Sequence, residues 1–322
     1  MYDVVIIGAG PIGLFSSFYA SLRGLKTLTL ESSNTYGGQL TKIYPEKPIY
    51  DLPGIKEIKA KDYIDNLYNQ YLPYSEKNPI LYNVEIHEVL SNEEYHLIKT
   101  NKGEFGAKTI LIASGNGNST PRKLEVENAL KCNNILYRLD NVEKYKNKDI
   151  VVLGGGDTAV DIANMLIDIS NVTIVHRRNE FRAHEESLEL FKKKNGVILT
   201  PYTVESIDYD NNLKALNLIN NENKEAKKLY CDYVFVSYGL LPNKNILNNI
   251  LDSDILGILV NPSMQTSKKG IYAVGNCCSY LGKVKTIASG MGEVATAITS
   301  IHQYLFPTKN PTFYSSINKE KN

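Results

Sequence analysis

Short apolar runs that end in glycine-rich turns recur along this chain and predict the buried strands of an α/β fold. The first run covers residues 4–7, is too short for a helix and stops at Gly8. An amphipathic segment follows over residues 11–23, with a proline at its start and Gly24 just past its end, as is typical of a helix. A second apolar run covers residues 26–30. The pattern therefore predicts a strand, a tight turn, a helix and a second strand.

The turn carries three glycines at a spacing that is typical of dinucleotide sites. Gly8 permits the tight turn, Gly10 lets a diphosphate approach the backbone, and Gly13 lets the helix pack on the strand. The diphosphate would lie on free N–H groups at the start of the helix, where the helix dipole favours negative charge. Glu31 follows the second strand, about 20 residues after the loop, where a ribose hydroxyl needs an acceptor. The stretch predicts a dinucleotide site, and the alternative is a tight turn that binds no ligand.

The same strand, turn, helix and strand occur a second time, farther along the chain. The strand covers residues 149–153, the glycine turn 154–159, the helix 160–169 and the next strand 172–175. The turn has alanine in the third position, which this motif allows. Because an enzyme that uses only a nicotinamide cofactor needs one such unit, two units in a chain of 322 residues indicate two bound nucleotides.

The residues after the second unit differ in charge from those after the first. His176, Arg177 and Arg178 stand where the first unit has Glu31, and Arg182 follows one turn later. An acid at this place would repel a 2′-phosphate, whereas guanidinium groups bind it through paired hydrogen bonds. We therefore expect NADP rather than NAD at the second unit, and the alternative is a solvated basic turn.

The remaining pattern completes two domains. Further elements are expected as a helix at 60–71, antiparallel strands at 84–90 and 95–100, buried strands at 109–113, 231–237 and 270–276, and a last helix at 290–304. Glycines and prolines exclude regular structure between residues 36 and 54. The chain predicts an α/β fold of two Rossmann-like, three-layer dinucleotide-binding domains, the second inserted into the first. Residues 1–116 and 245–322 would form the first domain, and residues 117–244 the second.

Composition and charge restrict the partners of this chain. A net charge of +1 gives no reason to expect nucleic acid, and no apolar run approaches the length that spans a membrane. The four cysteines, Cys132, Cys231, Cys277 and Cys278, include no CxxC pair, so neither a zinc ribbon nor a redox dithiol of that kind is present. We expect reduced thiols in a cytoplasmic protein, with no metal site and no signal segment.

Four longer motifs resemble those of the thioredoxin-reductase-like ferredoxin(flavodoxin)–NADP reductases, and the resemblance covers nearly the whole chain. They are YPEK at 44–47, PRKL at 121–124, HRRNEFRAHE at 176–185, and GKV at 282–284 followed by IASG at 287–290. Thioredoxin reductases carry a CxxC just upstream of the helix of the second glycine loop, but Cys132 is the only cysteine between the two loops here. The resemblance therefore implies that electrons leave the flavin directly for a protein carrier.

The resemblance implies an FAD-binding first domain, an NADP-binding second domain, and ferredoxin–NADP reductase activity. NADPH would pass a hydride to the flavin, single electrons would go on to ferredoxin or flavodoxin, and the enzyme would be a homodimer. No side chain is expected to act as an acid or a base. The residues implied for FAD are Gly8, Gly10, Pro11, Gly13, Glu31, Gly38, Gln39, Tyr44, Val84, Gly115, Asn276, Phe313 and Ser315. Those implied for NADP are Gly155, Gly156, Asp157, Thr158, His176, Arg177, Arg178 and Arg182.

Within this set, the resemblance implies particular contacts with the flavin nucleotide. Tyr44 would stack on the isoalloxazine ring, the alternative being a tyrosine that only packs its loop, and Gln39 would lie in the same region. Val84 would present its backbone to the adenine. In the homodimer, the tail of one subunit would cover the flavin of the other, with Phe313 as the stacking residue and Ser315 as a hydroxyl nearby.

Three positions depart from the family pattern, and two alternative functions stay open. Asn276 stands where the family usually has Asp, so it keeps an acceptor and loses the charge. Phe313 stands where some members have His, and Ser119 where an aromatic residue is frequent. The alternatives are a disulfide reductase that uses Cys277 and Cys278, and a flavin redox sensor with little turnover.

Overall fold

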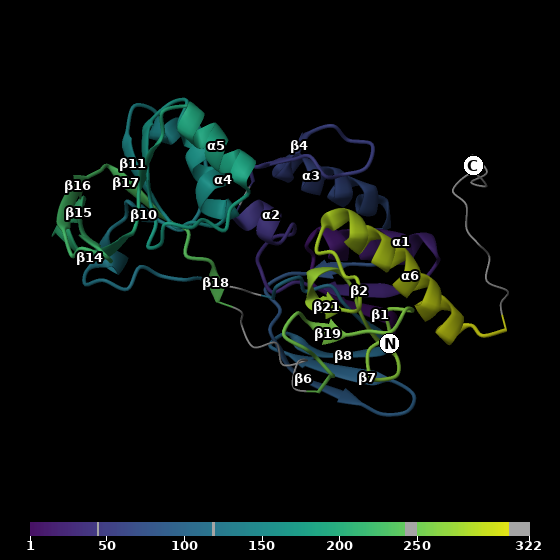
Figure 1. The fold of residues 1–322 in the computed structure, drawn as a ribbon. Coiled ribbons are helices and arrows are strands. Elements are labelled where there is room, and N and C mark those ends of the chain that lie inside the picture. Colours follow the sequence, from purple (N-terminus) through teal and green to yellow (C-terminus); the bar gives the residue numbers. More distant parts are fainter. Residues whose placement is uncertain (44, 118–119, 242–249, 309–322) are drawn as a thin grey trace. The chain divides into compact units, whose positions relative to one another are not determined.

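The computed structural model describes residues 1–43, 45–117, 120–241 and 250–308 (Figure 1). The chain divides into two compact units. The first holds residues 1–41, 48–118 and 244–322, and the second holds residues 42–47 and 119–243. The sequence pattern groups the segment 42–47 with the first domain, but here it belongs to the second unit, where Lys47 Nζ donates to Asp161 Oδ2 at 2.6 Å.

The first unit is built on one mixed sheet with the strand order β5-β2-β1-β8-β7-β6, and β20 also pairs with β8. The parallel strands are β1 (Tyr2–Ile7), β2 (Thr27–Leu30), β5 (Ile80–Leu81), β8 (Gly103–Ile112) and β20 (Ile271–Ala273). The antiparallel strands are β6 (Ile86–Ser91) and β7 (His96–Thr100). A parallel core with an antiparallel extension is thus the frame that places the first glycine loop.

Both faces of this sheet are buried. Val4 and Ile6 of β1 belong to a core cluster shared with α1 (Pro11–Leu22) and α6 (Ile287–Leu305), two helices that pack against each other (Figure 1). The neighbouring residues Val5 and Ile7 belong to a second cluster on the opposite face. Helix α3 (Ala60–Tyr71) packs on α1. Since successive residues of a strand point to opposite faces, a continuous apolar run is the pattern that a doubly covered parallel strand requires.

The second unit repeats this plan with a different third layer. Its parallel sheet has the order β10-β17-β11-β12-β13, from Ile135–Leu136, Tyr233–Val236, Asp149–Leu153, Asn171–Val175 and Val197–Leu199. One face packs on α4 (Asp157–Leu166) and α5 (Glu185–Lys193), and the other packs on an antiparallel sheet of three strands. Those strands are β14 (Tyr202–Asp210), β15 (Asn212–Asn220) and β16 (Ala226–Tyr230). The predicted fold class, α/β with two Rossmann-like three-layer units, is confirmed.

Several local expectations need correction. The stretch 36–54 was expected to lack regular structure, which is wrong, because Gln39–Lys42 contains neither glycine nor proline and forms the single turn α2. Helix α6 begins at Ile287 rather than at residue 290, since the Thr286 hydroxyl accepts the Ser289 N–H at 3.3 Å and caps it. The other short elements are β3 (Pro48–Ile49), β4 (Ile58–Lys59), β9 (Thr120–Pro121), β18 (Leu240–Leu241), β19 (Ile258–Leu259) and β21 (Cys278–Ser279). Within the described ranges, no helix is both long and apolar enough to pass through a membrane.

Candidate nucleotide-binding sites

The carboxyl ends of the parallel strands bring four predicted positions of the first unit to one edge of the sheet. Gly8 follows β1, Glu31 follows β2, Gly115 follows β8 by a short turn, and Asn276 follows β20. β1 lies between β2 and β8, and β20 pairs with the end of β8. This edge is where open α/β sheets bind their ligands.

The three glycines of the first loop differ in what a side chain at each position would meet. Gly8 has φ +103°, and a Cβ there would lie 2.7 Å from the carbonyl oxygen of Ala113. A Cβ on Gly13 would lie 1.8 Å from the carbonyl oxygen of Gly8, so the helix could not pack on the strand. Among the described residues, a Cβ on Gly10 would meet only the Cα of Gly38, at 3.9 Å. The fold therefore requires Gly8 and Gly13, whereas the open space over Gly10 suits a ligand.

Glu31 is held directly against this loop. Its Oε2 accepts the N–H of Ala9 at 2.7 Å, and its Oε1 accepts the N–H of Ser33 at 2.8 Å. The residue is only 5% exposed. The carboxylate is therefore fixed by backbone donors beside the glycine turn, at the place that the motif assigns to a ribose acceptor.

The other predicted residues of the first unit that the structure describes lie around the same edge. Gly38 has φ +61° and packs on Gly10, and Gln39 opens α2 directly after it. The buried Val84 donates its N–H to the carbonyl of Glu31 at 2.9 Å, which holds its backbone beside the end of β2. Pro11 is the first residue of α1. Tyr44, Ser119, Phe313 and Ser315 lie outside the described residues.

The second glycine loop repeats the same division of roles. Gly154 has φ +147°, and a Cβ there would lie 2.5 Å from the carbonyl oxygen of Ser237. A Cβ on Gly155 would collide with the ring of His176 at 2.5 Å, whereas one on Gly156 would meet no atom of the described part of the chain within 4 Å. Gly156 is the N-cap of α4, so the open position again lies at a helix start, where an anion is favoured.

Helix α4 begins earlier than the sequence pattern suggests. Asp157 and Thr158 form its first turn rather than the loop before it. Asp157 Oδ1 accepts the backbone N–H of His184 at 3.0 Å, which holds the segment after the arginines close to the helix start.

The basic residues after β12 divide into one residue that packs on the glycine turn, His176, and three exposed arginines. Burial and the neighbouring arginines lower the pKa of His176, whose ring covers Gly155 and whose Nε2 lies 3.1 Å from the carbonyl oxygen of Glu180. The Arg182 N–H donates to the carbonyl of Gly155 at 2.8 Å, so this loop is tied to the glycine turn. Arg177, Arg178 and Arg182 are all exposed, and none forms an ion pair with a residue that the structure describes. Positive charge at this loop therefore comes from guanidinium groups.

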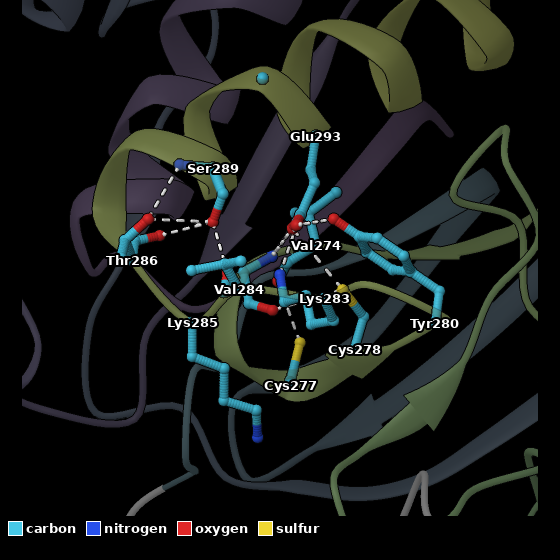
Figure 2. A network of polar contacts seen from close by, with 12 residues as sticks. Val274, Cys277, Cys278, Tyr280, Lys283, Val284, Lys285, Thr286, Ser289 and Glu293 are labelled. Carbon is cyan, nitrogen blue, oxygen red and sulfur yellow. Dashed lines mark hydrogen bonds and ion pairs between the residues drawn. The ribbon is translucent and has the colours of Figure 1, made fainter. Parts of the chain in front are cut away.

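Sequence reasoning missed one feature beside Asn276, a buried ion pair between Lys283 and Glu293 (Figure 2). Their side chains are 3% and 4% exposed. The available signal was Glu293 itself, the only acidic residue in helix α6.

Comparison with known proteins agrees with this geometry. Residues 2–303 match the family model described as pyridine nucleotide-disulphide oxidoreductase. The chain belongs to this family. The resemblance drawn from the motifs is confirmed by curated relatives over nearly the full length. This member of the family is 43% identical to a ferredoxin–NADP reductase of Acholeplasma laidlawii, with 98% of both chains covered. It is 38% identical to a ferredoxin–NADP reductase of Streptococcus mutans, with 96% of this chain and 94% of the relative covered.

Among solved structures, the chain is similar to the thioredoxin reductase of Lactococcus lactis. The TM-score is 0.80 at 26% identity, and the match covers 95% of this chain and 100% of the other. The family member described here has that architecture and lacks a CxxC motif.

Proposed function

We propose that this chain is an NADPH-dependent flavoprotein that reduces ferredoxin, with FAD in the first unit and NADPH in the second. The observation that carries the proposal is a pair of glycine cradles with opposite charge at their edges. Glu31 lies at the first, and Arg177, Arg178 and Arg182 lie at the second. The relatives named ferredoxin–NADP reductase support the carrier.

The residues of the first unit fit FAD. The open space over Gly10 admits a diphosphate to the N–H groups at the start of α1, and Glu31 offers oxygen acceptors to a ribose. When bound, FAD supplies a group that takes up a hydride and gives up electrons singly. The protein binds, orients and shields; no side chain is assigned an acid or base role. The further FAD contacts proposed are Gly8, Pro11, Gly13, Gly38, Gln39, Tyr44, Val84, Gly115 and Asn276.

The residues of the second unit fit NADPH. Gly156 leaves the N-terminus of α4 open to a diphosphate, and Gly155, Asp157 and Thr158 lie in the same turn. Three exposed guanidinium groups suit a 2′-phosphate, which an acid would repel. His176 contributes by packing on Gly155 and holding the turn.

The assembly and the location are also part of the proposal. We expect a homodimer in which Phe313 and Ser315 of one tail cover the flavin of the other subunit, and flavodoxin as a second acceptor. A cytoplasmic location fits four buried, unpaired thiols, because reducing compartments keep cysteines in this form.

The proposal is tested on the purified protein. We expect it to be yellow, to release FAD on denaturation, and to reduce ferredoxin with NADPH about 100-fold more efficiently than with NADH, as expected when two or more charged hydrogen bonds contact the extra phosphate. Flavodoxin is assayed in parallel. A colourless protein, or equal rates with both nucleotides, contradicts the proposal. Flavin reduction that stays slow at saturating NADPH favours a redox sensor.

A disulfide reductase built on Cys277 and Cys278 is disfavoured by their surroundings. Burial raises the pKa of both thiols, that of Cys278 to about 12, so neither is a ready thiolate. The Cys277 Sγ donates to the carbonyl of Ile112 at 3.3 Å, and the Cys278 Sγ to that of Gly275 at 3.3 Å.

Replacing both cysteines by serine is therefore expected to leave electron transfer intact. The serine hydroxyls can donate to the same carbonyls, so we expect NADPH-dependent ferredoxin reduction by C277S/C278S to stay within about threefold of the wild-type rate, a change below 1 kcal/mol. Reduction of a disulfide probe is measured beside it. A loss of more than about tenfold in ferredoxin reduction, matched by the probe, would support the thiol mechanism instead.

A further inference from the structure

A buried polar network joins helix α6 to the turn that carries Asn276 (Figure 2). Glu293, on α6, accepts the N–H of Gly275 through Oε2 at 2.7 Å. Its Oε1 accepts the Tyr280 hydroxyl at 2.8 Å and a short hydrogen bond from Lys283 Nζ. The Cys278 thiol lies 3.6 Å from Oε2. In the part of the chain that the structure describes, the partners of this carboxylate thus come from one segment, residues 275–283.

The same turn packs directly on the first glycine loop. A Cβ on Gly275 would lie 3.2 Å from Cγ1 of Ile12, in the first turn of α1. A Cβ on Gly290, one turn before Glu293, would lie 2.6 Å from Cδ1 of Ile12 and 3.5 Å from the Cα of Gly275. Helix α6, the turn and the start of α1 therefore meet within van der Waals distance, beside the cradle at Gly10.

A buried ion pair adds little to the stability of a fold by itself. Each charge loses its hydration, and apolar side chains of similar volume often stabilise a fold as well or better. The gain from Glu293 is therefore geometric, because one carboxylate fixes a backbone N–H, a hydroxyl and an ammonium at once. Lys283 compensates its charge.

We propose that Glu293, neutralised by Lys283, is a positioning residue that holds the Gly275–Cys278 turn so that Asn276 reaches the bound flavin nucleotide. This inference rests on the proposed function, since it assumes that FAD occupies the cradle of the first unit. It assigns to α6 a role in cofactor binding that acts through Asn276 rather than by direct contact.

The test uses two variants that both remove the buried charges. In E293Q/K283M, the glutamine oxygen still accepts the Gly275 N–H; in E293A/K283M, this acceptor is lost. FAD is removed from the purified protein, and its rebinding is followed by quenching of flavin fluorescence and by the visible absorption and circular dichroism of the bound flavin. We expect E293Q/K283M to bind FAD within about threefold of wild type and E293A/K283M to bind it about tenfold or more weakly, with altered flavin dichroism.

Two controls separate positioning from stability. I301A, also in α6 and fully buried but about two helical turns beyond Glu293, destabilises the same helix and should leave FAD affinity within about threefold. If Glu293 acts through Asn276, adding N276A to E293A/K283M should weaken FAD binding little beyond N276A alone.

Three outcomes overturn the inference. E293A/K283M binding FAD like wild type would do so, as would a loss no larger than that of an equally destabilised I301A, or full additivity with N276A. A wild-type protein that binds no FAD would remove the proposed function and the inference together, whereas a normal wild type with an unaffected E293A/K283M removes the inference alone.

Discussion

R177A/R178A is expected to lower kcat/KM for NADPH by at least about 100-fold and to leave kcat/KM for NADH within about threefold of wild type. A hydrogen bond to a charged group contributes about 1.5–3 kcal/mol, and 1.4 kcal/mol corresponds to a tenfold change. Both side chains are exposed and make no ion pair with a described residue, so their removal breaks no such pair in the described part of the fold. NADH lacks the 2′-phosphate and should not sense the change.

The measurement is steady-state ferredoxin reduction with each nucleotide in turn. The matched control is K193A, which removes one exposed positive charge from α5 of the same unit. If the arginines acted only by long-range attraction, kcat/KM would fall for both nucleotides, and it would also fall in K193A. If they contact the 2′-phosphate, only kcat/KM for NADPH in R177A/R178A falls. Parallel losses with NADH would show that the arginines do not recognise the phosphate. R182A then tests whether the third guanidinium adds to the effect.

The parts of the site that were predictable from the sequence are those with a local backbone reason. Gly8 has a positive φ and Gly13 leaves no room for a Cβ, so their spacing in the sequence predicts a strand-to-helix turn. The apolar run 4–7 is buried on both faces, and it was correctly predicted as a strand of a covered sheet. The strand and the glycine turn of the second unit were predicted on the same grounds.

The parts that escaped prediction depend on contacts between distant segments. The ring of His176 packs on Gly155. A residue that the sequence pattern groups with the phosphate-binding arginines therefore packs against the glycine turn instead. In the sequence, Lys283 stands out only as part of the GKV motif and Glu293 only as the acid of its helix; the fold is what buries the two charges together. The sheet β14–β16 was missed because β14 and β16 contain no buried residue and the pairing of β14 with β15 is interrupted by bulges.

The largest structural contrast is expected between two alanine substitutions in the first glycine loop. G13A should fail to give a folded first unit, because its Cβ, whose position the helix backbone fixes, would lie 1.8 Å from the backbone carbonyl oxygen of Gly8. G10A should fold, since its Cβ meets no described atom closer than the Cα of Gly38 at 3.9 Å and the φ of −69° suits alanine. We expect the free energy of unfolding of the G10A apoprotein to stay within about 1 kcal/mol of wild type.

G10A should nevertheless lose FAD affinity by about 100-fold or more, because its methyl group occupies the space through which a diphosphate reaches the N–H groups of α1. Urea unfolding of the apoproteins and FAD titration measure the two effects separately. G292A is the control: it adds a methyl to an exposed helical glycine of α6 with nothing within 4 Å, so it should keep FAD affinity and gain helix stability. Wild-type FAD affinity in G10A would mean that the diphosphate does not approach this loop, and a normally folded G13A would contradict the packing reason for the third glycine. Stable apoprotein with lost affinity in G10A, beside unfolded G13A, would separate the glycine that the fold requires from the glycine that the ligand requires.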